Sequence, residues 1–287
     1  MKVLITGGSG LLGGALISAS SNMGIESVPT YHSNPIGRAS VKIDVMNLHG
    51  VERALREIEP DCVIHAAALT NVDLCENDPT RAWAINADAT KNVADACNDE
   101  GAKVIYISTD YVFDGQNGPY SEAAVPHPIN VYGESKLAGE KFTMEYPGNV
   151  VARVCVLYGA GRPNFVTWVI DSLGKNALIT VVTDQYNTPT YTGNCAQALL
   201  TMCKLDLHGI YHVSGRERMN RYDFAHAIAE VFGLNENLIK STTSNGLYQR
   251  AKRPRDSSLN VEKAEKALGM RLANVREGLM MMKGELQ

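Results

Sequence analysis

Residues 6–13 have the sequence TGGSGLLG and follow directly on the apolar run Val3–Ile5. This pattern predicts a strand that turns through glycines into a helix. Gly7, Gly10 and Gly13 are spaced three apart, which lets the backbone bend tightly, admit a pyrophosphate and pack the helix onto the sheet. The first N–H groups of the helix would attract that pyrophosphate. We therefore predict a dinucleotide site at this turn, with a turn that binds no ligand as the alternative.

The first half of the chain alternates short apolar runs with helical patterns. The runs predict strands at Val3–Thr6, Ser27–Thr30, Cys62–His65, Val104–Ser108 and Val150–Val154. Helical patterns lie between them, at Leu11–Asn22, Leu48–Ile58, Thr80–Glu100 and Tyr132–Tyr146. Strands without apolar–polar alternation, separated by helices, are typical of a parallel sheet buried on both faces. Right-handed crossovers then give an α/β fold with a doubly wound, Rossmann-type sheet.

Beyond Val154 this alternation ends. Helices are expected at Asn164–Gly174, Gly193–Cys203, Tyr222–Phe232, Val261–Leu268 and Val275–Lys283, and strands at Leu178–Val182 and Ile210–Val213. The segment Leu234–Ser258 is polar and has little periodicity. We interpret residues 1–154 as a dinucleotide-binding domain and residues 155–287 as a smaller substrate-binding lobe, interleaved with a late sheet strand and helix.

Composition excludes several classes of protein. The chain has 287 residues and a net charge of −4 at pH 7, so its surface as a whole does not favour nucleic acid or an anionic membrane. No apolar run is long enough to span a bilayer, and the N-terminus lacks the layout of a signal peptide. The six cysteines follow no CxxC or zinc-ligand spacing, which is typical of free thiols in a reducing compartment. We therefore expect a cytoplasmic protein, and the sequence leaves a homodimer open.

The predicted second strand ends in Thr30-Tyr31-His32-Ser33, where a carboxylate would bond the adenosine ribose and repel a 2′-phosphate. No acid stands there and Arg38 is near, which favours NADPH and leaves NADH open. The small side chains of Ala66–Ala68 would let a dinucleotide lie close to the strand ends. The candidate cofactor-binding residues are Gly7, Gly10, Leu11, Leu12, Gly13, Thr30, Tyr31, His32, Arg38, Asp44, Val45, Ala66, Ala67, Ala68, Tyr132 and Lys136.

Tyr132 and Lys136 lie four residues apart on a predicted helix and therefore share one face. A phenol normally has a pKa of about 10, and a neighbouring ammonium would lower it. Tyr132 could then protonate a carbonyl oxygen as hydride reaches the carbon, while Lys136 bonds the nicotinamide ribose. Thr109 follows the predicted strand Val104–Ser108, at the edge where parallel sheets bind ligands, and its hydroxyl could bond the same carbonyl. A chance Tyr–Lys pair on a helix surface is the alternative.

Further motifs extend along most of the chain: residues 66–73 (AAALTNVD), 108–115 (STDYVFDG), 130–140 (NVYGESKLAGE), 184–190 (DQYNTPT) and 253–259 (RPRDSSL). With these motifs the chain resembles the extended short-chain dehydrogenase/reductase family, and within it the dTDP-4-dehydrorhamnose reductases and their relatives. The resemblance implies reduction of the 4-keto group of a nucleotide-linked 6-deoxyhexose, completing dTDP-L-rhamnose. It also implies that Thr109, Tyr132 and Lys136 are catalytic. The substrate contacts it implies are Thr109, Asp110, Val156, Asn164 and Arg253.

The chain departs from this subfamily at one site position. The reductases carry a Ser-Trp-x-Tyr run whose tryptophan packs on the substrate, whereas this chain has Cys155-Val156-Leu157-Tyr158. Without that aromatic surface the sugar is not determined. Some members bind magnesium through a carboxylate where this chain has Gly14-Ala15, so we expect no metal.

Two other functions stay open. The regulatory subunit of methionine adenosyltransferase resembles the same subfamily, binds NADP, and shares the missing tryptophan and an Arg-Pro-Arg run, so a noncatalytic NADP-binding regulator is one alternative. A reductase or epimerase of another nucleotide sugar is the other. The basic residues Arg250, Lys252, Arg253 and Arg255 fit either a solvated loop or contact with the substrate diphosphate.

Overall fold

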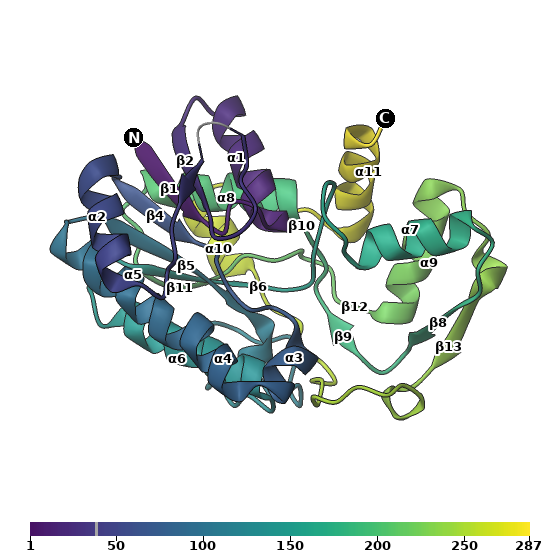
Figure 1. The fold of residues 1–287 in the computed structure, drawn as a ribbon. Coiled ribbons are helices and arrows are strands. Elements are labelled where there is room, and N and C mark those ends of the chain that lie inside the picture. Colours follow the sequence, from purple (N-terminus) through teal and green to yellow (C-terminus); the bar gives the residue numbers. More distant parts are fainter. Residues whose placement is uncertain (38–39) are drawn as a thin grey trace.

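The computed structural model describes residues 1–37 and 40–287. Its larger part is a seven-stranded sheet with the order β11-β6-β5-β4-β1-β2-β3, shown on the left of Figure 1. Every neighbouring pair in this sheet is parallel. The strands are β1 (Lys2–Thr6), β2 (Glu26–Tyr31), β3 (Val41–Lys42), β4 (Cys62–His65), β5 (Lys103–Thr109), β6 (Val150–Val154) and β11 (Gly209–His212). The doubly wound parallel sheet predicted from the sequence is confirmed.

The chain enters the sheet at its centre. From β1 it winds first to β2 and β3, then crosses back to β4 on the other side of β1, with Val3 level with both Ser27 and Cys62. This reversal leaves a crevice beyond the carboxyl ends of β1 and β4, where such sheets bind ligands.

Helices cover both faces of the sheet. Val3 and Ile5 point to the face covered by α1, α8 and α10, whereas Leu4 points to the face covered by α2 and α5. All residues of β4 and β6 are buried, which explains why their sequences show no alternation. The helices of this part are α1 (Leu11–Asn22), α2 (Leu48–Ile58), α3 (Val72–Asn77), α4 (Pro79–Trp83), α5 (Ala89–Asp99), α6 (Val131–Met144), α8 (Thr192–Lys204) and α10 (Glu262–Leu268).

The helix expected over Thr80–Glu100 is interrupted. It forms as α4, a π-helical turn over Ala84–Asp88, and α5. The turn places Asn86 in the interior, where its side chain makes the hydrogen bonds described below. A π-turn is common near functional sites and has no apolar signature in the sequence.

The rest of the chain forms a smaller lobe with its own core, on the right of Figure 1. Apolar side chains of its helices, such as Val169, Phe224 and Leu279, make up this core. Its elements are β7 (Leu157–Tyr158), α7 (Phe165–Gly174), β8 (Ile179–Val182), β9 (Tyr186–Asn187), β10 (Thr190–Tyr191), β12 (Met219–Asn220), α9 (Arg221–Phe232), β13 (Ile239–Thr242) and α11 (Val275–Glu285).

Strand β13 was not expected, because Leu234–Ser258 reads as a polar segment. It pairs in parallel with β8, with Ile239 opposite Ile179, and only Ile239 of its four residues is buried. The strand therefore forms through backbone pairing with β8, which a local apolar pattern does not reveal.

Candidate active site

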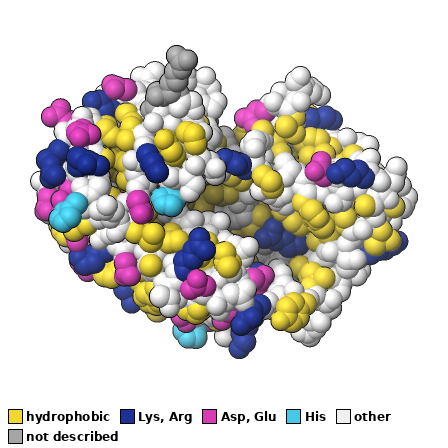
Figure 2. Space-filling view, viewed as in Figure 1, with side chains coloured by type: hydrophobic (Ala, Val, Ile, Leu, Met, Phe, Trp, Pro, Cys, Tyr) yellow, Lys and Arg dark blue, Asp and Glu magenta, His cyan; other side chains and the backbone are white. Residues whose placement is uncertain are grey.

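A large cavity opens along the carboxyl ends of the central strands. It has a volume of about 870 Å³ and forms the hollow between the sheet and the lobe in Figure 2. Arg253 is not among the residues that line it, and Arg38 lies outside the described residues. The candidate residues that do line it are Gly7, Gly10, Leu11, Leu12, Gly13, Thr30, Tyr31, His32, Asp44, Val45, Ala66, Ala67, Ala68, Thr109, Asp110, Tyr132, Lys136, Val156 and Asn164.

The glycine turn forms the wall beside β1. Gly7 has a φ of 68°, and a Cβ there would lie 2.8 Å from the backbone nitrogen of Ala67, so a larger residue does not fit. At Gly10 a Cβ would meet only the Gly7 carbonyl oxygen, at 3.1 Å, and would otherwise point into open space. Helix α1 begins at this turn with neither a side-chain cap nor an acid in its first turn. Its first N–H groups are therefore available to an anion.

A directed chain of hydrogen bonds lies beneath this wall. Thr6 Oγ1 accepts from the backbone N–H groups of Ala66–Ala67 at 3.1 and 3.2 Å, so its own proton is left for His65 Nδ1 at 2.7 Å. His65 Nε2 then donates to Thr90 Oγ1 at 3.2 Å, and Thr90 donates to the Asn86 carbonyl at 2.8 Å. These directions assign His65 as the neutral Nε2–H tautomer. Burial and, to a smaller extent, the Lys136 charge lower the pKa of His65 to about 3.

The chain of hydrogen bonds continues into α6, the helix that carries Tyr132. Asn86 Nδ2 donates to Ser135 Oγ at 3.1 Å, and Ser135 donates to the Tyr132 carbonyl at 2.9 Å. Asn86 also exchanges two hydrogen bonds with the backbone of Leu69, on the loop that follows β4. Strand β1, this loop and helix α6 are thus tied together, which fixes the glycine turn relative to Tyr132.

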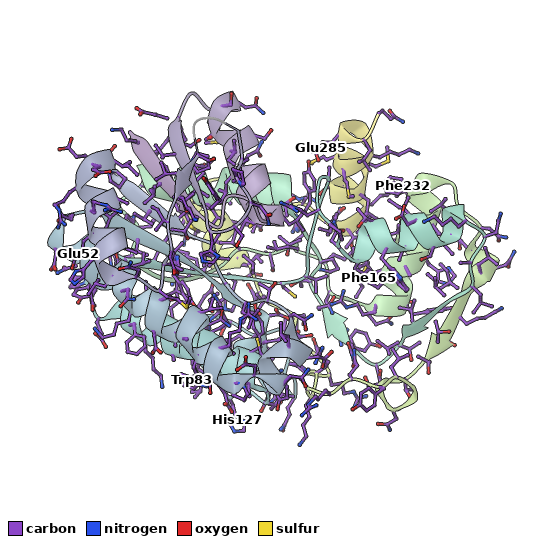
Figure 3. All side chains as sticks on the ribbon, viewed as in Figure 1. Glu52, Trp83, His127, Phe165, Phe232 and Glu285 are labelled. Atoms are coloured by element: carbon purple, nitrogen blue, oxygen red, sulfur yellow. The ribbon has the colours of Figure 1, made fainter. Side chains whose placement is uncertain are left out.

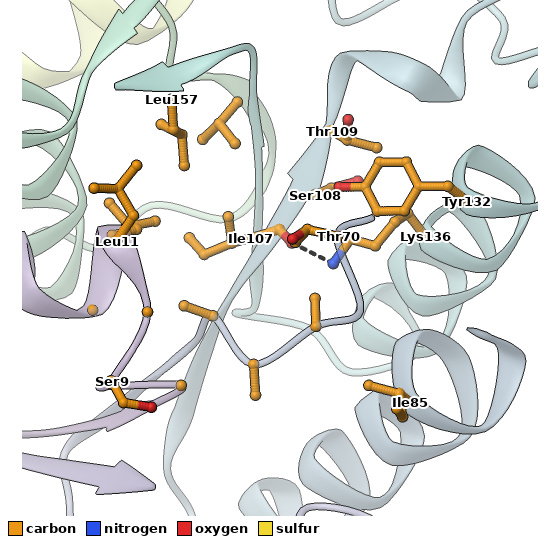
Figure 4. A pocket seen from close by; sticks show the side chains of 18 of the residues that line it. Ser9, Leu11, Thr70, Ile85, Ile107, Ser108, Thr109, Tyr132, Lys136 and Leu157 are labelled. Atoms are coloured by element: carbon orange, nitrogen blue, oxygen red, sulfur yellow. Dashed lines mark hydrogen bonds between the residues drawn. The ribbon is translucent and has the colours of Figure 1, made fainter. Parts of the chain in front are cut away.

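Three predicted catalytic side chains meet at one corner. Figure 4 shows Thr109, Tyr132 and Lys136 on one side of the cavity, opposite Ser9 and Leu11 of the glycine turn. Thr109 ends β5, and the other two project from the same face of α6, which begins where the Asn130 side chain caps it. Lys136 Nζ donates to the Ile107 carbonyl at 2.6 Å. Burial lowers the pKa of Lys136 to about 7, against the opposing charge of Glu140.

The electrostatics of Tyr132 differ from the sequence-based expectation. Desolvation raises the pKa of Tyr132, and the nearby Thr109 hydroxyl opposes this rise only in part. The expected lowering of the Tyr132 pKa by Lys136 is wrong for this structure. The Lys136 amine is directed at the Ile107 carbonyl, and burial is the largest influence on the pKa of both side chains. At neutral pH the phenol therefore keeps its proton.

Two of the proposed substrate contacts already have hydrogen-bond partners within the protein. Asp110 is 3% exposed, and its two carboxylate oxygens accept hydrogen bonds from the side chains of Thr109 and Ser257. Asn164 caps α7, because its Oδ1 accepts from two backbone N–H groups and its Nδ2 donates to two carbonyls. Both residues line the cavity. Asn164 also holds the backbone at the start of α7, and Asp110 ties the Thr109 and Ser257 hydroxyls together.

Arg253 is turned toward another partner. Its guanidinium makes two hydrogen bonds to the Asp73 carboxylate, at 2.9 and 3.2 Å, and a third to the Ala251 carbonyl. Arg253 therefore fastens the loop after β13 to helix α3. The sequence interpretation of Arg253 as a diphosphate ligand missed this pair, since the two residues are 180 positions apart.

The opposite wall of the cavity contains residues that the sequence did not single out. Phe165 begins α7 and Arg221 begins α9, and the guanidinium carbon of Arg221 lies 5.0 Å from the centre of the Phe165 ring. Figure 3 shows Phe165 on the part of the lobe nearest the sheet. Val156, which the resemblance does imply as a substrate contact, also lines the cavity. It has a φ of 41°, which is unusual for a β-branched residue, and its carbonyl accepts from Thr190 N–H at 3.0 Å. Strain of this kind is often found at binding sites.

The comparison with protein families decides the identity of the chain. The family described as RmlD substrate binding domain matches residues 1–287. The chain belongs to this family.

Three known proteins illustrate what the chain is similar to. A crystal structure of dTDP-4-dehydrorhamnose reductase from Bacillus anthracis in complex with NADP is 33% identical, with a TM-score of 0.90 and 99% of each chain covered. The "Probable low-salt glycan biosynthesis reductase" of Haloferax volcanii is 35% identical over 94% of this chain and 93% of its own length. The methionine adenosyltransferase 2 subunit beta of Bos taurus is 34% identical over 92% of this chain and 81% of its own.

The described residues contain neither a metal-binding cluster nor a membrane-spanning helix. Within residues 1–37 and 40–287, no group of His, Cys, Asp and Glu side chains is arranged to hold a metal ion. No helix in the same residues has the length and apolar character needed to cross a bilayer.

Proposed function

We propose that this RmlD-family protein reduces the 4-keto group of a nucleotide-linked 6-deoxyhexose with NADPH, and that NADH is the alternative coenzyme. The observation that carries the proposal is the presence of an open glycine turn and the Thr109–Tyr132–Lys136 corner on opposite sides of one cavity. The reductase relative bound to NADP supports the class of cofactor.

The cavity fits a dinucleotide at the sheet edge. Gly10 leaves the backbone open to a pyrophosphate, and the uncapped N-terminus of α1 supplies donors for it. Tyr31 and His32 at the end of β2 would border the adenosine, and Lys136 would hold the nicotinamide ribose. In this arrangement residues 1–154 bind the coenzyme, and residues 155–287 supply most of the opposite wall.

The chain's own residues would handle the proton. A bound reduced nicotinamide supplies a hydride to the carbonyl carbon. Tyr132, kept protonated by its raised pKa, donates its phenolic proton to the carbonyl oxygen as negative charge develops there. Thr109 donates to Asp110 in the present structure, and rotation of its hydroxyl would direct that proton to the same oxygen. The Tyr111 backbone N–H, which donates to Thr109 Oγ1 at 3.1 Å, would keep that oxygen in place when the hydroxyl rotates.

A noncatalytic regulator is the second candidate. It is favoured by the 34% identity to the methionine adenosyltransferase subunit and by Val156, which puts an aliphatic side chain on the cavity wall. In that case the same cavity would hold NADP without turnover.

The experiment is an assay of NADPH oxidation with a panel of nucleotide-linked 4-keto-6-deoxyhexoses that differ in base and sugar. Wild-type protein should oxidise NADPH with at least one of them, and Tyr132→Phe should not. If no sugar in the panel is reduced, and the tagged protein instead copurifies with a methionine adenosyltransferase catalytic subunit, the regulator is the correct assignment.

A further inference from the structure

Arg221 is a half-buried arginine on the cavity wall. It is the first residue of α9, where the Asn220 side chain caps the helix by accepting from Asp223 N–H at 2.8 Å. Its own backbone N–H donates to the Gln185 carbonyl at 3.2 Å, so the main chain is fixed on both sides. The guanidinium carbon lies 5.0 Å from the centre of the Phe165 ring, a cation–π contact that helps to hold the group at this position.

Other arginines around the site already have carboxylate partners. Arg253 pairs with Asp73 at 2.9 Å, Arg218 with Asp256 at 2.8 Å, and Arg153 with Glu140 at 2.7 Å. Across the described part of the chain, no carboxylate lies within 4.0 Å of the Arg221 guanidinium. Arg81 also lines the cavity, but its side chain is exposed to solvent.

The charge of Arg221 acts on the catalytic corner. Burial raises the pKa values of Asp110 and Tyr111, and the Arg221 charge opposes both shifts. The Tyr111 ring lies 6.0 Å from the Tyr132 ring, edge to face. Arg221 and Tyr132 line the same cavity, so an anion held by Arg221 would share it with the group that donates the proton. In a nucleotide-linked hexose, the sugar ring separates the C4 carbonyl from the diphosphate, and the substrate would span the distance between the two residues.

We propose that Arg221, and not Arg253, binds the diphosphate of the substrate and so positions the sugar at Tyr132. This inference rests on the proposed function. A guanidinium recognises phosphate through two parallel hydrogen bonds, and a partly desolvated arginine without a counter-ion gains most from such a ligand. The cation–π contact with Phe165 helps to hold the guanidinium at the cavity wall.

The test is a binding measurement, which needs no turnover. Titration calorimetry on the NADPH-saturated protein would compare wild type, Arg221→Gln, Arg221→Lys and the control Arg216→Gln, an exposed arginine in the segment before α9. The ligands are dTDP, UDP and, as a control without the diphosphate, thymidine. We expect Arg221→Gln to weaken anion binding by about 10- to 100-fold, the usual range for a hydrogen bond to a charged group, and Arg221→Lys to restore part of it. The affinity for NADPH should be the same in all four proteins. Arg216→Gln should bind dTDP and UDP as tightly as wild type does.

A loss of affinity for dTDP and UDP in Arg221→Gln, with thymidine binding unchanged, supports the diphosphate as the group that Arg221 binds. Equal affinities in wild type and Arg221→Gln, or a wild-type protein that binds none of the three ligands, would overturn the inference. Loss of reductase activity in the panel assay with anion binding intact would instead refute the proposed reaction alone.

Discussion

Lowering the pH from 7 to 5 should remove about 2 kcal/mol from the free energy of unfolding through His65 alone. In the unfolded chain His65 has a pKa near 6.5, whereas burial and the Lys136 charge lower it to about 3 in the fold. Below pH 6.5 the unfolded chain therefore binds a proton that the folded chain does not, so stability falls as the pH drops toward 3. Integrating this difference between pH 7 and pH 5 gives about 2 kcal/mol.

The hydrogen bonds around His65 explain why protonation is disfavoured. A proton on Nδ1 would face Thr6 Oγ1, whose lone pairs already accept from the N–H groups of Ala66–Ala67. Accepting a third N–H would require Thr6 to release one of these backbone groups. The folded protein binds this proton only near pH 3, so His65 stays neutral in the fold between pH 7 and pH 5. We therefore expect no loss of NADPH affinity through His65 over that range.

Urea denaturation at pH 7 and pH 5 measures the effect in wild type and in His65→Gln, which cannot titrate. His212 is also buried, with its pKa lowered to about 3 by burial and by Arg153, so the total loss in wild type exceeds the His65 share. The loss of unfolding free energy in His65→Gln contains the contributions of His212 and the carboxylates but not that of His65. Subtracting it from the loss in wild type should leave about 2 kcal/mol. An equal loss in the two proteins would refute the neutral, buried His65.

Four other substitutions test the site and its support. Tyr132→Phe should keep NADPH affinity and lose about 10²- to 10⁴-fold in turnover, because only the proton donor is removed; turnover close to wild type would reject Tyr132 as the acid. Gly10→Ala should stay folded, because its Cβ enters open space at the turn, but that Cβ would occupy the space proposed for the pyrophosphate. We expect NADPH to bind at least about tenfold more weakly by calorimetry. Gly13→Ala should instead lower the melting temperature, because its Cβ would overlap the Gly7 carbonyl. Glu140→Gln should lose about 3–5 kcal/mol in urea denaturation, because it leaves the buried Arg153 guanidinium without its counter-charge. A loss below about 1 kcal/mol would mean that Arg153 finds another partner.

The sheet and the glycine turn could be predicted from the sequence because their signals are local. Buried parallel strands such as β4 and β6 are continuous apolar runs, and the Gly7–Gly13 turn must contain glycine for reasons of backbone geometry. The Tyr132–Lys136 pair follows from helical spacing alone. These features depend on residues that are close together in the chain.

The remaining features depend on contacts between distant residues. The two-residue strands of the lobe and β13 form through pairing with partners far along the chain, so no local pattern marks them. Arg253 and Arg221 are both basic residues of the C-terminal part, and only the position of Asp73 shows that the first is already paired. The direction of the Tyr132 pKa shift likewise depends on how deeply the phenol is desolvated.

Deuterium transfer would test the central claim most directly. The protein is mixed with NADPH that carries deuterium at both C4 positions of the nicotinamide, together with the nucleotide-linked 4-keto sugar that gives turnover. The account predicts one deuterium on C4 of the product sugar, seen by mass spectrometry, with wild type and a strongly reduced yield with Tyr132→Phe. A product without deuterium, or equal yields from the two proteins, would contradict it.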